Sequence, residues 1–210
     1  MRSFFETTEE DWTHPAGQLH FYLTPREDFA ALVHPYEEAL EASELVALQP
    51  SQALHATAQR LPFFADSPQA ERIDEYIAAL HAAFCEWDAP AITFTAPIVT
   101  EDSVLCPSDN LDIWGRYTSR IRQCLTEVFG PEGTHFGPVP RPHITLAYGI
   151  GSGDSTELEK TLRNITAHEG LSTQNTFYSQ PLDHLDIVTV HQKISEGTYL
   201  FDTLNRVALT

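Results

Sequence analysis

Two stretches of the sequence share one pattern, His55-Ala56-Thr57-Ala58 and His143-Ile144-Thr145-Leu146. Each places a histidine two positions before a threonine, in a mostly apolar segment that is typical of a β-strand. Because side chains i and i+2 of a strand point to the same face, each copy presents an imidazole beside a hydroxyl. The copies are far enough apart for helices and further strands between them. We expect a two-lobed arrangement to bring both pairs into one cleft.

Helical and alternating patterns follow each other along the chain. Helices are predicted over 27–42, where Pro35 divides or kinks the helix, and over 67–87, 111–129 and 155–167. Strands are predicted over 19–23, 45–48, 53–58, 91–99, 103–105, 142–148, 185–191 and 199–209. Adjacent strands with helices between the groups favour an α+β fold with mainly antiparallel sheets. We expect residues 1–16 to be a loosely ordered, acidic lead-in to a single domain spanning 1–210.

The charge of the chain limits its partners. The sequence has 30 acidic and 12 basic residues, so its net charge is −18 with neutral histidines. A protein that coats nucleic acid neutralises phosphates with clustered Lys and Arg, so that class of protein is excluded. A single small anionic ligand remains compatible with the composition, because one phosphate needs only a few local donors.

The N-terminal sequence and the cysteines indicate a cytoplasmic protein. The first residues are acidic and lack the apolar stretch of a signal peptide, and no apolar run approaches the roughly 20 residues that span a bilayer. Cys85, Cys106 and Cys124 are widely spaced and form no CxxC pair, which is typical of reduced thiols. We expect no contact with a membrane, and we take the protein to be a monomer.

The paired motifs themselves indicate phosphodiester chemistry. The sequence contains no HExxH, no phosphate-binding loop, no GxSxG and no GxGxxG, so we expect neither a metal nor a cofactor. Histidine has an ordinary pKa of about 6.5, so near pH 7 one ring can be neutral while the other is protonated. His55 and His143 around one phosphate would supply a base and an acid. The hydroxyls of Thr57 and Thr145 would bind its non-bridging oxygens.

The ordered combination of both motifs resembles the 2H phosphoesterase superfamily, and in particular the bacterial proteins called 2′-5′ RNA ligases or RNA cyclic phosphodiesterases. The resemblance runs through 18–209 and includes the closing stretch Gly197-Thr198-Tyr199. It implies a bilobal fold in which two mainly antiparallel sheets line a central cleft, with helices outside. It also implies hydrolysis of a 2′,3′-cyclic phosphate on a nucleotide or RNA end to a 2′-phosphomonoester. We favour His55 as the acid and His143 as the base, although the sequence does not order them.

Four further residues are candidates for substrate binding. Tyr22, Phe64 and Tyr148 either stack on a base or ribose or pack in the core. Arg141 stands two residues before His143, so on a continuous strand it would point to the same face. It is either a donor to the phosphate or a solvent-exposed charge.

Three alternatives stay open at this stage. The residues Ala58 and Ala147-Tyr148-Gly149 stand where the family usually has a larger aliphatic residue and a basic residue. A catalytically weak module that binds nucleotides or RNA ends would explain these departures. Some relatives run the reverse reaction and join RNA through a 2′-5′ linkage. A metallohydrolase built from scattered His, Asp and Glu is the third alternative, and no close spacing of ligands supports it.

Overall fold

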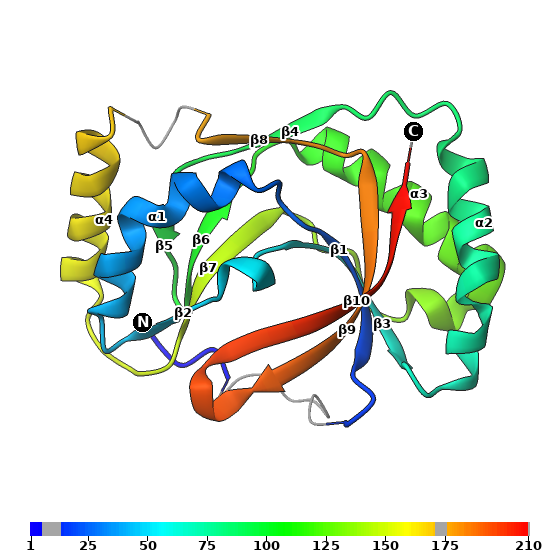
Figure 1. Ribbon diagram of the computed structural model, residues 1–210, viewed down its shortest axis with the longest axis horizontal. Coiled ribbons are helices and arrows are strands. Elements are labelled where there is room, and N and C mark those ends of the chain that lie inside the picture. The colour runs from blue at the N-terminus through cyan, green and yellow to red at the C-terminus, as the bar shows by residue number, and fades with distance from the viewer. Residues whose placement is uncertain (6–13, 171–175, 210) are drawn as a thin grey trace.

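The computed structural model describes residues 1–5, 14–170 and 176–209. Within these ranges the chain forms two four-stranded sheets, one two-stranded sheet and four α-helices (Figure 1). All strand pairs in these sheets are antiparallel. The predicted α+β class with mainly antiparallel sheets is therefore confirmed.

The first four-stranded sheet has the strand order β10-β9-β1-β3. Its members are β1 (Gln18–Leu23), β3 (Ala56–Phe64), β9 (His184–Lys193) and β10 (Thr198–Ala208). The helices α2 (Ile73–Phe84) and α3 (Leu111–Phe129) lie together beside this sheet (Figure 1). The ring of Phe21 on β1 stacks on Tyr76 of α2, with 4.9 Å between the ring centroids. The hydroxyl of Tyr117 on α3 donates to the carbonyl of His184 at 2.8 Å.

The second four-stranded sheet has the order β2-β7-β6-β5. Its members are β2 (Val46–Leu48), β5 (Ile98–Val99), β6 (Ser103–Pro107) and β7 (His143–Gly149). The helices α1 (Asp28–Glu41) and α4 (Thr156–His168) lie at this end of the molecule, opposite α2 and α3 (Figure 1). A hydrogen bond of 3.1 Å joins the hydroxyls of Tyr36 on α1 and Thr166 on α4. Helices therefore flank both sheets on the outside, as the resemblance implied.

Short elements complete the fold. The strands β4 (Ala91–Phe94) and β8 (Tyr178–Pro181) form the two-stranded sheet, and 3₁₀ turns are η1 (Ser51–Ala53), η2 (Pro68–Arg72), η3 (Gly130–Thr134) and η4 (Ile194–Glu196). The sequence analysis did not predict β8. Its four residues end in a proline and carry no alternating pattern of their own, so only their pairing with β4 makes them a strand.

Two predicted helices differ from the structure. The helix expected over 67–87 begins with the 3₁₀ turn η2, so that α2 starts only at Ile73. The helix α1 runs through Pro35 without dividing, although proline removes one hydrogen bond from the helix interior. Phe29 and Tyr36 of α1 are fully buried, on either side of Pro35. Burial of this continuous face offsets the local cost of the proline.

Residues 1–5 differ from the loosely ordered lead-in that we expected. The amide of Arg2 donates to the carbonyl of Glu101 at 2.8 Å, and the amide of Phe4 donates to the carbonyl of Gly149 at 2.9 Å. These bonds attach the segment to the end of β7 and to the turn that precedes β6. Residues 6–13 of the expected lead-in lie outside the described residues.

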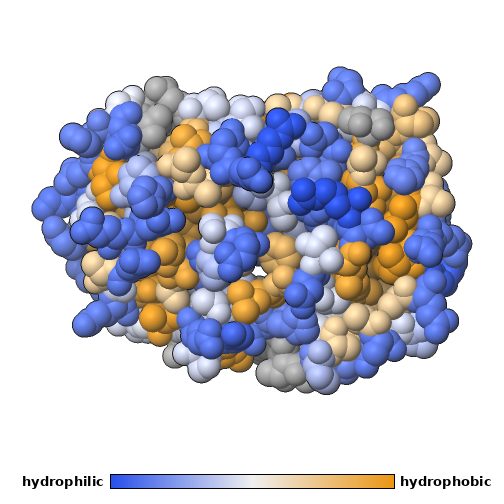
Figure 2. Space-filling view, in the orientation of Figure 1, coloured by the Kyte–Doolittle hydropathy of each residue, from blue (hydrophilic) through white to orange (hydrophobic). Residues whose placement is uncertain are grey.

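The central strand β1 shows how the fold separates core from cavity. Leu19, Phe21 and Leu23 belong to the large hydrophobic core. The alternate residues His20 and Tyr22 line a cavity on the opposite face. In the space-filling view hydrophilic and hydrophobic side chains are mixed over the visible face, and the face is hollowed near its middle (Figure 2). Among the described residues, no helix combines the length and apolar character needed to cross a bilayer.

Candidate active site

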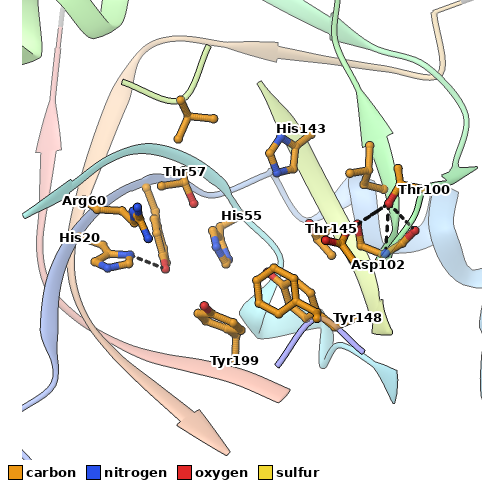
Figure 3. Close-up of a pocket in the computed structure, with 15 residues that line it drawn as sticks. His20, His55, Thr57, Arg60, Thr100, Asp102, His143, Thr145, Tyr148 and Tyr199 are labelled. Carbon is orange, nitrogen blue, oxygen red and sulfur yellow. Dashed lines mark hydrogen bonds between the residues drawn. The ribbon is translucent and has the colours of Figure 1, made fainter. Parts of the chain in front are cut away.

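One cavity of about 420 Å³ is lined by both histidine-threonine pairs (Figure 3). Its walls come from β1, β3, β6, β7 and β10, from the segments just before β3, β6 and β7, and from the N-terminal segment, so both four-stranded sheets contribute to it. The lining residues are Phe4, His20, Tyr22, His55, Thr57, Arg60, Thr100, Asp102, Ser103, Leu105, Val139, His143, Thr145, Tyr148 and Tyr199. The cleft that we expected from the spacing of the two motifs is therefore present in the structure.

The first ring, His55, lies immediately before β3 and is buried, with an exposed fraction of 9%. Its Nδ1 lies 2.7 Å from the carbonyl oxygen of Ala53, which can only accept, so Nδ1 carries the proton and donates. The ring of Tyr22 stacks flat on the imidazole, with 3.7 Å between centroids and 11° between planes. The edge of Phe201 packs against the same imidazole at 5.5 Å. The His55 ring is therefore fixed by one hydrogen bond and two aromatic contacts.

The second ring, His143, is the first residue of β7 and is partly exposed. Its Nδ1 lies 3.0 Å from the carbonyl oxygen of Arg141. In both motifs the histidine thus donates from Nδ1 to the backbone carbonyl two residues earlier. Such a bond fixes the tautomer and leaves Nε2 as the nitrogen that can exchange a proton with a ligand. The two motifs consequently match in hydrogen bonding as well as in residue type.

The two motif strands also share an irregularity just after the threonine. On β3, Thr57 pairs with Tyr22 while Gln59 pairs with Phe21, so Ala58 is an extra residue in the ladder. On β7, Thr145 pairs with Leu105 while Ala147 pairs with Val104, so Leu146 is the extra residue there. Beyond a bulge of this kind, each side chain points to the face opposite to the one that simple alternation along the strand predicts.

Because of these bulges, each strand presents a third side chain to the cavity. The residue three positions after the threonine joins the histidine and the threonine, namely Arg60 on β3 and Tyr148 on β7. The two strands therefore offer the matched sets His55, Thr57 and Arg60, and His143, Thr145 and Tyr148. The guanidinium of Arg60 also lies over the ring of Phe136, at 4.7 Å from its centroid.

Burial makes the first motif electrostatically distinct. The pKa of His55 is lowered to about 4, mainly by burial and to a smaller extent by repulsion from His143, while the hydrogen bond to Ala53 acts in the opposite direction. The pKa of the neighbouring His20 lies well below its ordinary value because of burial, with Arg60 and His55 adding repulsion. His20 contacts the Tyr22 hydroxyl at 3.0 Å and the side-chain oxygen of Gln18 at 3.1 Å. At neutral pH both buried rings of this half are therefore neutral in the free protein, which disfavours the expected role of His55 as the acid.

The structure brings together six of the eight residues that the sequence analysis selected. His55, Thr57, His143, Thr145, Tyr22 and Tyr148 line the cavity. Tyr22 differs from the expectation in one respect, because one face of its ring is occupied by His55 and is closed to a base.

Two selected residues lie elsewhere. The guanidinium of Arg141 forms an exposed ion pair with Asp109, and Arg141 contributes its backbone carbonyl to the site. It precedes the first residue of β7, so the alternation of a strand does not extend to it. Phe64 is outside the residues that line the cavity, and its ring packs on His14 with 4.2 Å between centroids. The arginine that does line the cavity is Arg60, which stands on the motif strand itself.

The sequence analysis also missed one side of the cavity. Thr100, Asp102 and Ser103 form a hydrogen-bonded group there, in which the Thr100 and Ser103 hydroxyls lie 2.8 Å apart (Figure 3). Phe4 and Tyr199 complete this part of the wall. Arg60 was also missed, and the sequence signal that could have indicated it is that Arg60 follows His55 by as many residues as Tyr148 follows His143. The described residues contain no group of three or more His, Cys, Asp and Glu side chains that could hold a metal.

Comparison with solved structures supports the fold. TT0787 of Thermus thermophilus superposes with a TM-score of 0.63 at 17% identity, covering 91% of this chain and 97% of that one. A protein described as a phosphoesterase gives a TM-score of 0.59 at 14% identity, covering 92% and 99%. Escherichia coli LigT complexed with 3′-AMP gives 0.56 at 15% identity, covering 92% and 98%. No protein-family model matches the sequence, and no curated protein matches it either. The LigT-like fold implied by the resemblance is therefore confirmed.

Proposed function

We propose that the protein hydrolyses 2′,3′-cyclic phosphates on nucleotides or RNA ends to 2′-phosphomonoesters, by acid–base catalysis that requires no metal. The observation that carries this proposal is the matched pair of imidazoles. Both rings line one cavity, both are held through Nδ1, and each has a threonine hydroxyl beside it. A solved structure with this fold is described as a phosphoesterase, and another contains LigT with bound 3′-AMP, which supports a phosphoester of a nucleotide as the substrate.

The proposed reaction needs one proton acceptor and one proton donor. A neutral ring takes a proton from water through Nε2 while the water oxygen attacks phosphorus. The bond between phosphorus and the ribose O3′ breaks, and the second ring, protonated beforehand, gives its Nε2 proton to O3′. The product is a 2′-phosphomonoester with a free 3′-hydroxyl. Each turnover consumes one water, and one proton passes from the first ring to the second through solvent.

The other matched residues bind charge that develops on the phosphate. The hydroxyls of Thr57 and Thr145 donate to non-bridging oxygens, and the guanidinium of Arg60 offers a charge-assisted bond. Among the described residues that line the cavity there is a single arginine and no lysine, which suits one phosphate rather than a polyanion. This agrees with the net charge of −18, which disfavours a long RNA bound along the surface.

The proposal is tested by replacing each ring and following adenosine 2′,3′-cyclic phosphate by chromatography that resolves the 2′- and 3′-phosphates. We expect His55→Asn and His143→Asn each to lower kcat by about 10²–10⁴-fold. Excess chelator should leave the wild-type rate unchanged. His34→Asn is the matched control, because His34 is exposed and pairs with Glu37 on its own helix. Unchanged turnover in either cavity variant, or a 3′-phosphate product, would contradict the proposal.

A further inference from the structure

The N-terminal segment, residues 1–5, forms a wall of the cavity, although it lies far from both motifs in sequence. The bonds from Arg2 to Glu101 and from Phe4 to Gly149 hold its backbone along the end of β7. The guanidinium of Arg2 adds ion pairs with Glu101 at 3.3 Å and with Asp102 at 4.0 Å. The segment is thus attached to the side of the cavity on which Asp102 lies.

The end of the second motif strand is shaped to accept this segment. A Cβ atom on Gly149 would collide with the backbone oxygen of Arg2 and would lie 3.0 Å from that of Asp102. Glycine at this position permits the close approach of a neighbouring backbone. The segment therefore has a fixed place on β7, directly beyond Tyr148.

The two phenylalanines of the segment both pack on Tyr148 and Tyr199 but differ in exposure. Phe5 is buried, with an exposed fraction of 8%, and it belongs to a small hydrophobic core with Tyr148 and Tyr199. Phe4 is partly exposed and lines the cavity. Its ring lies 4.5 Å from that of Tyr148, tilted by 36°, and 5.8 Å from that of Tyr199. Phe5 thus anchors the segment, whereas Phe4 adds an aromatic surface to the cavity wall.

The polar residues on the Asp102 side of the cavity suit a heteroaromatic ring with N–H groups. Ser103 pairs with Tyr148 across the strands β6 and β7, and its hydroxyl contacts the Asp102 carboxylate at 3.2 Å. Figure 3 shows Thr100, Asp102 and Tyr148 toward one side of the two histidines, with Arg60 and His20 toward the other. A carboxylate accepts hydrogen bonds but repels a phosphate. This side of the cavity therefore favours a base over a second phosphate.

We infer that Phe4 is a substrate-binding residue that stacks, together with Tyr148, on the base of the nucleotide. The inference rests on the proposed function for the position of the phosphate between the two imidazoles. Aromatic side chains bind any nucleobase through its face, so this wall gives affinity for a base without strong selection among bases. The N-terminal segment is accordingly part of the nucleotide site.

Calorimetry with adenosine 2′-phosphate tests the inference apart from turnover, with inorganic phosphate as the probe that has no base. Phe4→Ala should weaken binding of adenosine 2′-phosphate by roughly 5- to 150-fold, whereas Phe4→Tyr should keep the affinity within about threefold. Affinity for inorganic phosphate should be the same in all three proteins. Phe64→Ala serves as the control, because Phe64 is a partly exposed phenylalanine of β3 outside the cavity wall.

Three results would overturn the inference. They are an unchanged affinity of Phe4→Ala for adenosine 2′-phosphate, an equal loss of affinity for both probes, and absence of binding of adenosine 2′-phosphate by the wild-type protein. Equal loss would mean that Phe4 only maintains the shape of the site. If the expected binding pattern holds while the cyclic nucleotide is not turned over, the proposed function fails and the stacking role of Phe4 stands.

Discussion

The motif on β3 and the motif on β7 hold their histidines in the same way but surround them differently. His55 is buried under Tyr22 and beside Phe201, whereas His143 is partly exposed. Three positions beyond the threonine, β3 carries the cation Arg60 and β7 carries Tyr148. Matched backbones therefore give the two rings different electrostatic environments. In our account both halves contact the phosphate, Arg60 of β3 adds a cation to it, and Tyr148 of β7 meets the base.

The largest expected effect comes from replacing His55 and His143 together. If His55 and His143 act as a unit on one phosphate, the double variant His55→Asn/His143→Asn should be about as slow as the worse single variant. Single-turnover hydrolysis of adenosine 2′,3′-cyclic phosphate measures this directly. Losses that multiply, so that the double variant equals the product of the two singles, would show that the rings act independently.

The burial of His55 predicts that the stability of the protein depends on pH. Its pKa is about 4 in the folded protein and about 6.5 in the unfolded chain, so between these values only the unfolded chain binds the proton. Stability is therefore fully present above pH 6.5 and decreases as the pH falls toward 4, by roughly 3 kcal/mol from this group. The lowered pKa of His20 acts in the same direction.

Urea unfolding at a series of pH values measures that loss. The variant His55→Gln should lose less stability between pH 6.5 and 4 than the wild type, because it has no proton to bind at that position. The exposed control His34→Gln should follow the wild type. Equal pH dependence in the wild type and His55→Gln would show that burial does not depress the pKa of this ring.

Arg60 and Tyr148, which stand three positions after the two threonines, should differ in how much their replacement lowers turnover. Arg60→Met removes a charge-assisted bond to the phosphate and should lower kcat/KM by roughly 10- to 150-fold, with partial recovery in Arg60→Lys. Tyr148→Phe keeps the aromatic surface and should change kcat/KM by less than about threefold. Steady-state kinetics on one cyclic nucleotide compares the three variants. If Arg60→Met and Tyr148→Phe lower kcat/KM by similar factors, Arg60 of β3 does not bind the charge of the phosphate.

The two threonines should behave alike, since the motifs match at this position. Thr57→Val and Thr145→Val each remove one hydroxyl donor and should each lower kcat by roughly 3- to 10-fold. Rates at saturating substrate, with unfolding midpoints measured in parallel, make the comparison. A large loss in only one variant would mean that the phosphate contacts a single motif strand.

The sequence was sufficient for the features that depend on neighbouring residues. The alternation of a strand places each histidine beside its threonine, and both pairs line the cavity as expected. The strand or helix type of most segments also follows from local periodicity. Arg60 was not assigned to the cavity, and Tyr148 was a candidate only as an aromatic residue beside the motif, because the extra residues Ala58 and Leu146 arise from pairing with other strands.

Other parts of the site depend on contacts between distant segments. Tyr22 stacks on His55 because β1 pairs with β3 in a register that places it opposite Thr57. Phe4 reaches the cavity because a glycine at the end of β7 admits the N-terminal segment. Neither contact produces a periodic pattern in a single sequence. Phe4 was therefore expected in a loosely ordered lead-in and not in the cavity wall. Arg141 was selected because it precedes the motif by two residues, but it lies before the strand begins.

The most direct test of the account is nitrogen-15 NMR of the histidine rings during titration with adenosine 2′-phosphate. In the free protein both His55 and His143 should be protonated at Nδ1 and, when neutral, unprotonated at Nε2. On binding, the Nε2 signals of both rings should shift together with one dissociation constant, because both rings contact the same phosphate. A response from only one of the two rings, or a free protein with the Nε2–H tautomer, would contradict the account.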